Sequence, residues 1–221
     1  ANWDMPQTLM VSATDDNDTV NESVTLTLSS AGLPNRTVTV AVMDDDVQSI
    51  TVDNTNVMVT EGASGAIAVN LAFNPVNPVT VTIVSNDTGA VSVNPATLTF
   101  TSANFGTPQS VTVTGVEDQD LAAESVQVTL TSPVAPNINV TVAVADDDVQ
   151  AINVSQTTLN IDEGEVTTVA ISLAFAPAGT VMLTVTSSDA DAVGANPTTL
   201  TFTPQTFASQ QLVTITGVQD N

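Results

Sequence analysis

The sequence lacks several of the side chains on which most enzymes depend. Cysteine, histidine and lysine are all absent from its 221 residues. Without cysteine there are no disulfides and no thiolate metal sites. Without histidine and lysine there is no usual general base near neutral pH, no Ser-His nucleophile pair and no Schiff-base chemistry. We therefore expect no enzymatic activity.

Positive charge is almost absent as well. Arg36 is the single base against 24 acidic residues, which gives a formal net charge of −23. Nucleic acid and anionic membrane surfaces are recognised by Lys and Arg, so neither is an expected partner. No apolar run reaches membrane length, so we expect no direct membrane insertion. Because 42% of the residues are hydrophobic, the chain is expected to fold, and cations are its natural counterpart.

The sequence repeats itself at a spacing of 102 residues without insertion or deletion. MPQTLMVSATDDNDTVNESVTLTLSS returns as TPQSVTVTGVEDQDLAAESVQVTLTS, and VAVMDDDVQSI returns as VAVADDDVQAI. Such self-similarity indicates an array of like modules. Two periods of 102 residues plus 17 make up the 221, and the first residue is Ala1. We expect an excerpt of a longer chain that continues beyond both ends in further units.

Apolar residues alternate with Thr, Ser or Ala in short runs, which is the two-residue period of a half-buried strand. In the complete unit we predict seven strands, A to G, at residues 50–60, 66–73, 79–85, 91–100, 110–116, 125–131 and 139–145. Seven short strands in about a hundred residues indicate an all-β fold of tandem immunoglobulin-like seven-strand β-sandwich repeats.

The predicted repeats divide the chain into three parts. Residues 1–46 supply strands E to G of one repeat, residues 47–148 form a complete repeat, and residues 149–221 supply strands A to E of a third. All aromatic residues occupy positions that are equivalent at the 102-residue spacing, and we expect them in the cores. They are Phe73 and Phe175, Phe100 and Phe202, and Trp3, Phe105 and Phe207.

The acidic residues are confined to alternate loops. In a seven-strand sandwich the AB, CD and EF loops and the end of strand G share one pole, and only Asp4 and Asp53 fall outside such poles. The complete repeat places there Glu61, Asp87, Glu117, Asp118, Asp120, Glu124, Asp146, Asp147 and Asp148. The flanking repeats place there Asp16, Asp18, Glu22, Asp44, Asp45, Asp46, Glu163, Asp189 and Asp220, with Asp15, Asp162, Glu165 and Asp191 beside them.

Carboxylates gathered at one pole repel one another. A like-charge pair at about 4 Å costs roughly 1 kcal/mol in bulk water and about 4 kcal/mol at an effective dielectric constant near 20. Ca²⁺ fits as the neutralising cofactor because it binds oxygen ligands in flexible geometry and needs neither His nor Cys, whereas Mg²⁺ demands a tighter octahedron. A solvated acidic surface, or adaptation to high salt, also explains the charge, but it predicts dispersed acids.

Several motifs of the complete unit, in this order, resemble a Calx-β domain. They are VTEGA (59–63), NDTGA (86–90), LTFT (98–101), VTVTGVEDQDLAAESVQVTL (111–130) and DDD (146–148). They are also similar to the Calx-β-like and extender repeats of large bacterial surface adhesins. The resemblance implies calcium ligands at Glu61, Asp87, Asp118, Glu124 and Asp146 to Asp148, with Glu117 and Asp120 as supporting carboxylates.

Only Val149 and Gln150 separate the last acid of one unit from the next predicted strand. This linker has no Gly, Pro or Ser tract that would make it flexible. We therefore expect neighbouring repeats of the same chain as partners and a calcium-rigidified extracellular stalk on the cell surface. The alternatives are a self-assembling matrix or surface-layer filament, in which like chains are partners, and a ligand-binding adhesin module that uses loops at the acid-free pole.

Overall fold

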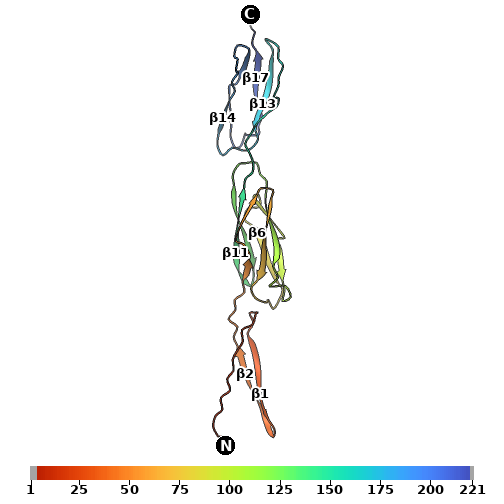
Figure 1. Ribbon diagram of the computed structural model, residues 1–221, viewed down its shortest axis with the longest axis vertical. Helices are drawn as coiled ribbons and strands as arrows, with labels where there is room; N and C mark the ends of the chain where they lie inside the picture. The colour runs from red at the N-terminus through yellow and green to blue at the C-terminus, as the bar shows by residue number, and fades with distance from the viewer. Residues whose placement is uncertain (1–3, 220–221) are drawn as a thin grey trace.

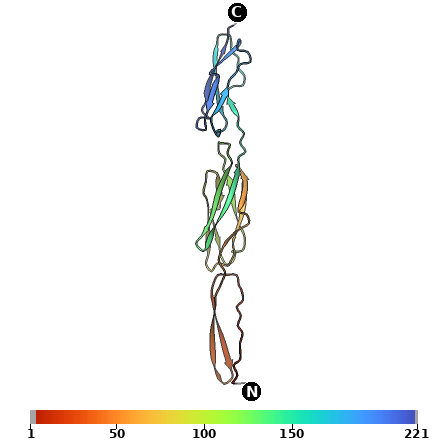
Figure 2. The same cartoon turned by 90° about the vertical axis from the view of Figure 1, so that its left-hand side faces the viewer.

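The computed structural model describes residues 4–219. These residues form 17 strands in five sheets, with no helix among them, so the predicted all-β class is confirmed. Three groups of strands follow one another along a single long axis (Figures 1 and 2). A search of the described residues for a helix long and apolar enough to cross a bilayer finds none.

The middle unit is a two-layer β-sandwich. One sheet has the order β4 (Asn56–Thr60), β11 (Ala135–Ala145), β10 (Glu124–Ser132), β6 (Val79–Ser85) and β8 (Thr97–Phe100). The other has the order β3 (Ile50–Val52), β5 (Ser64–Leu71), β9 (Gln109–Gly115) and β7 (Val91–Asn94). Neighbouring strands are antiparallel, except that β4 runs parallel to β11. This is the two-sheet arrangement expected of an immunoglobulin-like domain.

Two of the predicted strands are divided. Predicted strand A becomes β3 and β4, which belong to different sheets. Between them, Asp53 donates its N–H to the carbonyl of Ala68 at 3.1 Å and accepts the N–H of Ala68 on its carboxylate at 2.8 Å. Its side chain therefore extends the pairing with β5 where β3 ends. Predicted strand D is divided into β7 and β8 around Pro95, whose missing N–H cannot join a ladder.

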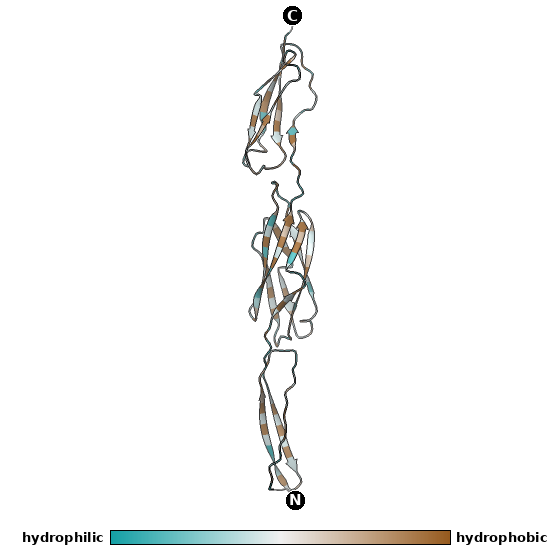
Figure 3. Ribbon diagram, turned by 60° about the vertical axis from the view of Figure 1, so that its left-hand side comes forward, coloured by the Kyte–Doolittle hydropathy of each residue, from teal (hydrophilic) through white to brown (hydrophobic). Residues whose placement is uncertain are grey.

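The cores lie between the sheets and consist mainly of Val, Ile and Leu from alternate strand positions. β6 shows the pattern, because each buried residue is followed by an exposed one along its length. Figure 3 shows the hydrophobic residues following this alternation along the strands. Phe100 and Phe202 are fully buried, Phe105 and Phe207 pack against the cores, Phe73 and Phe175 are half-buried at the unit junctions, and Trp3 lies outside the described residues.

The third unit repeats the four-stranded sheet with β12 (Ile152–Val154), β13 (Val166–Leu173), β17 (Gln211–Gly217) and β15 (Val193–Asn196), and pairs β14 (Val181–Thr184) with β16 (Thr199–Phe202). The described part of the first unit holds only the hairpin of β1 (Glu22–Ser30) and β2 (Leu33–Val42). Its predicted strand E, which the 102-residue spacing places at residues 8–14, forms no strand. The equivalent β9 lies between β5 and β7, and the first unit has no counterparts of those partners among the described residues.

Candidate metal centre

Glu61 lies at the centre of the acidic pole of the middle unit. It follows β4 directly, and its N–H donates to the carbonyl of Ala145 at 3.1 Å. The next N–H, of Gly62, donates to the carbonyl of Gly115 at 3.0 Å. A Cβ atom at Gly115 would lie 2.7 Å from the carbonyl oxygen of Thr60, so this close approach requires glycine. These contacts hold Glu61 with only 4% of its surface exposed.

Two aspartates of the EF loop and one just after the end of β11 make the same kind of local hydrogen bond. Oδ1 of Asp118, Asp120 and Asp146 accepts the N–H two residues further along, at 2.7, 2.7 and 2.9 Å. Such Asx turns hold a loop and leave the second carboxylate oxygen free. The equivalent aspartates of the first unit make the same bonds at 3.0, 2.8 and 2.8 Å.

Two groups of carboxylates in the middle unit have the spacing of a metal site, and both include Glu61. Glu61, Asp118 and Glu124 form one group, and Glu61, Glu117 and Asp147 form the other. One oxygen from each residue of a group lies within 4.8 Å of the others. The AB loop, the EF loop and the end of β11 thus supply ligands to one place. These groups can hold a metal ion.

Three carboxylates of this pole each have one buried oxygen without a hydrogen-bond partner among the described residues. Oε2 of Glu61 accepts the N–H of Asp118 at 3.3 Å, whereas its Oε1 is buried without a partner. Oδ2 of Asp146 and Oδ2 of Asp148 are also buried and unpartnered. A buried acceptor without a donor typically costs about 1–3 kcal/mol, and more if it is charged. No Lys or Arg lies at this pole, so no ion pair within the described chain neutralises these oxygens.

The same surroundings raise the pKa of three carboxyl groups in the middle unit. Burial is the main cause for Glu61, and the charges of Asp118, Asp146 and Asp148 raise its pKa further. Burial followed by the charge of Asp118 raises the pKa of Glu124. The pKa of Asp148 is raised by its partial burial and by Asp146. A cation bound here would reverse these shifts, because it favours the ionised carboxylates.

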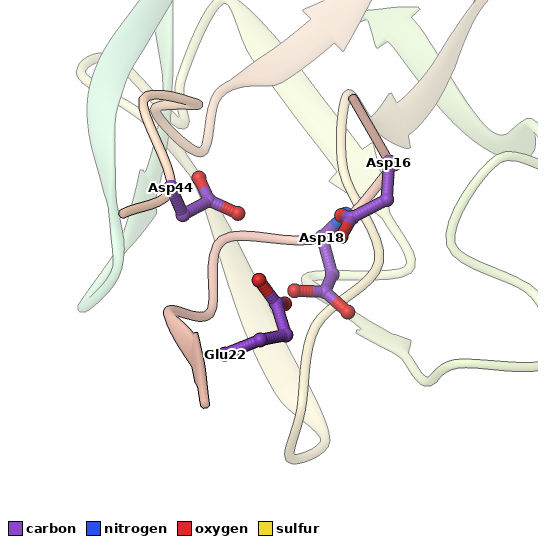
Figure 4. Close-up of side chains that lie close together, drawn as sticks. All are labelled: Asp16, Asp18, Glu22 and Asp44. Atoms are coloured by element: carbon purple, nitrogen blue, oxygen red, sulfur yellow. The ribbon is translucent and has the colours of Figure 1, made fainter. Parts of the chain in front are cut away.

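The first unit gathers four carboxylates, and two of them, Asp16 and Glu22, are the counterparts of Asp118 and Glu124. Asp16, Asp18, Glu22 and Asp44 each place one carboxylate oxygen within 4.8 Å of the others. Figure 4 shows these four side chains, which come from the loop before β1, from β1 itself and from the segment after β2. The pKa of Glu22 is raised, first by its local burial and then by the three aspartates. The first and the middle unit thus both gather carboxylates at this pole.

Some predicted ligands lie outside these groups. The carboxylate of Asp87 is exposed and accepts the N–H of Gly89 at 2.9 Å, and Asp189 makes an equivalent bond to Asp191 at 3.1 Å. Glu163, the counterpart of Glu61, is exposed in the third unit. Asp220 lies outside the described residues. The predicted ligands that lie near a group without joining one are Asp45, Asp46, Asp120, Asp146 and Asp148.

The junctions contain polar residues that the sequence analysis did not identify. In the first junction Gln48 donates from Nε2 to the carbonyl of Phe73 at 2.8 Å and accepts the N–H of Phe73 at 3.2 Å. In the second, Gln150 makes both bonds to Phe175 at the same distances. Each glutamine thus connects the linker to the BC loop of its unit, which is the loop between β5 and β6 in the middle unit and between β13 and β14 in the third. The recurrence of Gln at positions 48 and 150, 102 residues apart, is the sequence pattern that could have identified these two residues.

The EF loop of each unit also bonds to the BC loop of the next. The N–H of Asn74 donates to the carbonyl of Asn17 at 2.7 Å, and the N–H of Ala176 donates to the carbonyl of Gln119 at 2.7 Å. The side-chain oxygen of Asn74 is buried without a partner among the described residues, and Asn74 lines one pocket together with Asp18 and Glu22. Asn74 of the middle unit therefore borders the acidic group of the first unit.

Comparisons with known proteins give no family assignment. No protein-family model matches the sequence, and no curated protein matches it. The predicted relation to Calx-β domains stays a prediction.

Among solved structures, domains 4–9 of the surface-layer protein SbsC align with 90% of this chain and 31% of their own, at 18% identity and a TM-score of 0.40. A structure of SbsC domains 4 and 5 aligns with 50% of this chain and with 59% of its own chain, at 28% identity and a TM-score of 0.33. A GH5 xyloglucanase from Bacteroides ovatus aligns with 44% of this chain and with 19% of its own chain, at 16% identity and a TM-score of 0.34. This chain spans less than two thirds of each. Scores of this size are too low to define a shared fold, so the description of the fold rests on the strands themselves.

Proposed function

We propose that the chain is a segment of an extracellular structural rod, a stalk of a large cell-surface or adhesin-type protein, whose units are braced by Ca²⁺ at their junctions. The observation that carries this proposal is the buried carboxylate of Glu61. One of its oxygens has no donor among the described residues, and Glu61 belongs to both carboxylate groups of the middle unit.

The donor set supports calcium as the ion. All candidate ligands are oxygens, and carboxylates are combined with the amide oxygen of Asn74 in the first junction. Ca²⁺ takes roughly six to eight such ligands in flexible geometry, whereas Mg²⁺ needs a near-ideal octahedron and keeps several waters. Loops that converge from three strand ends suit the larger ion.

The position of the site supports a bracing role. The EF loop that supplies Asp118 also supplies the carbonyl of Gln119, which accepts a hydrogen bond from the next unit. The strand that ends at Ala145 leads through Asp147 directly into the linker that Gln150 clamps. Neutralising the carboxylates would therefore order both connections to the next unit.

Calcium titration with calorimetry and small-angle scattering tests this function. We expect calcium to raise the melting temperature, because it binds only the folded state, and to narrow the distribution of interdomain distances. Magnesium at the same concentration is the control and should have a smaller effect. Equal melting temperatures in EDTA and in millimolar calcium would rule out the metal.

A self-assembling filament is the second candidate. It is supported by the junctions, because the glutamine bonds and the loop-to-loop backbone bonds that join neighbouring units recur at the 102-residue spacing. In that function the chain itself would be the repeating element of an extracellular polymer.

A further inference from the structure

The chain enters and leaves the middle unit on strands that lie side by side. β4 follows the entry strand β3, β11 leads into the linker to the third unit, and β4 and β11 are paired in parallel over five residues. The strands of this unit run roughly along the long axis of the molecule (Figures 1 and 2). A pull along this axis therefore draws β4 toward the first unit and β11 toward the third, and it shears the two strands past each other.

The hydrogen bonds between β4 and β11 carry such a pull together. The N–H of Thr141 donates to the carbonyl of Thr55 at 2.9 Å at one end of this ladder, and the N–H of Glu61 donates to the carbonyl of Ala145 at 3.1 Å at the other. Because these bonds lie across the direction of sliding, all of them must lengthen at once, whereas bonds that are peeled open break one after another. β4 is the edge strand of its sheet, so this ladder is what holds it there.

One of the two carboxylate groups lies where this ladder ends. Glu61 directly follows β4, Asp147 comes two residues after the end of β11, and one oxygen of each lies within 4.8 Å of the other and of an oxygen of Glu117. Glu117 reaches this place over Gly62, where φ is +65° and a Cβ atom would collide with Oε1 of Glu117, so the approach requires glycine. Independently of the clustering, the buried and unpartnered Oε1 of Glu61 points to a ligand at this position.

We propose that a cation held by Glu61, Glu117 and Asp147 is a latch that keeps β4 from sliding along β11, so that calcium sets the load that the rod can carry. This inference rests on the proposed function, because it takes the bound ion to be calcium. Calcium lies about 2.3–2.6 Å from its ligands, whereas one residue of a strand spans about 3.3 Å. A slide of β4 by a single residue therefore takes Glu61 out of reach of an ion that stays with Asp147. The ion must leave before or while the ladder breaks, so the two resistances act in the same step.

The second carboxylate group of this pole strengthens the same latch. It joins Glu61 to Asp118 of the EF loop and to Glu124, the first residue of β10. Glu124 pairs with Val144 of β11, so β10 moves with β11 when the unit is pulled. Glu61 is the one member of either group that moves with β4. Both groups thus oppose the slide through this single carboxylate.

The test is single-molecule force spectroscopy at constant force on the 221-residue chain. The sequence has no cysteine, so Val47→Cys and Val149→Cys introduce two unique attachment sites in the linkers on either side of the middle unit. Both side chains are exposed, and the load between them passes through β4 and β11. For a dissociation constant on the order of 10⁻⁴ M, roughly 10 mM calcium is about 100 times that constant. An ion that must leave first should then lengthen the lifetime under load about 100-fold relative to EDTA.

A second pair of attachment sites loads the same unit in another direction. Val76→Cys in the BC loop and Val134→Cys in the FG loop are exposed positions at the pole without acids. A pull between them peels β10 from β6, starting at the pair of Thr131 with Thr82, while the carboxylate groups at the other pole stay intact. Calcium should lengthen this lifetime less than about threefold, because an interaction still present in the transition state leaves the unfolding rate unchanged. An equal effect in both directions would overturn the latch.

Asp147→Asn, in the chain with the linker attachment sites, removes the ligand that moves with β11. Asp147 is exposed, so the lifetime in EDTA should not become shorter, which also shows that the variant folds. Its calcium-dependent increase should fall roughly tenfold or more, because even the outer partners of metal ligands change affinity about 10–100-fold. Asp87→Asn is the matched control, since it removes the same charge from the same pole and Asp87 belongs to neither group. Its increase should equal that of the parent chain.

Calorimetric titration of the same chains with calcium separates the latch from the proposed function. Calcium that binds without changing the lifetime along the axis, or a full increase retained by Asp147→Asn, would overturn the latch and leave the proposed function standing. No binding at all would overturn the proposed function, and the latch with it.

Discussion

Glu61→Gln is expected to have opposite effects on stability with and without calcium. In EDTA the substitution removes a buried charge whose pKa is raised by burial and by neighbouring carboxylates, so the middle unit should melt at the same or a higher temperature. In calcium it removes a ligand that both carboxylate groups share, so the unit should melt at a lower temperature than the wild type.

The size of the calcium effect follows from mass action. For an extracellular site with a dissociation constant on the order of 10⁻⁴ M, roughly 10 mM calcium is about 100 times that constant. One such site stabilises the folded state by about 2.7 kcal/mol. For a domain of about 100 residues this corresponds to roughly 10–20 °C in melting temperature. Glu61→Gln should lose most of that increase.

Differential scanning calorimetry in EDTA and in calcium measures the effect. Glu165→Gln is the matched control, because Glu165 is exposed and belongs to neither group, and its calcium-dependent increase should equal that of the parent chain. If Glu61→Gln lowered the melting temperature equally in EDTA and in calcium, Glu61 would act through packing alone, and the reasoning on its unpaired oxygen would fail.

Three further predictions concern the same poles. The pKa values of Glu61 and Glu124 are raised in the folded state, so in EDTA the folded state binds protons more readily than the unfolded state. The melting temperature should therefore rise as the pH falls from 7 toward the usual pKa of a glutamate, near 4.5. A melting temperature that falls over this range would contradict the charge repulsion. Asp118→Asn should weaken calcium binding, measured by calorimetric titration, while the unit stays folded. Asp53→Asn should leave calcium binding unchanged, because Asp53 only extends a strand pairing. Equal effects of the two substitutions would refute the assignment of acids to poles. Gln150→Ala removes two bonds to Phe175 and should broaden the scattering-derived distance distribution of the rod, with little change in the melting of the middle unit.

Much of the fold could be predicted because the two-residue period fixes which residues face the core. The predicted strand at 79–85 coincides with β6, and the strands at 110–116 and 125–131 lie within one residue of β9 and β10. The divisions of strands A and D could not be read from periodicity, because both halves of each strand keep the same alternation. They follow from the backbone at Asp53 and Pro95, where the ladder is completed by a side chain or has no N–H.

The sequence predicts at which end of the unit the candidate ligands gather, but it does not predict which of the carboxylates lie close enough to share an ion. The loop rule brings Glu61, Asp118, Glu124 and Asp147 together, and the structure groups them as two sets. The same rule includes Asp87, whose carboxylate instead accepts the N–H of its own CD loop. Loop position does not determine where a side chain points. The contribution of Asn74 could not be seen either, because it comes from the neighbouring unit.

The two junctions share two kinds of hydrogen bond. Gln48 and Gln150 make equivalent bonds, and so do the backbone groups that join each EF loop to the next BC loop. Units joined by equivalent contacts are related by one transformation, and repeating one transformation generates a regular rod or superhelix. Calcium bound at the acidic pole of each unit would then set the stiffness of the array uniformly.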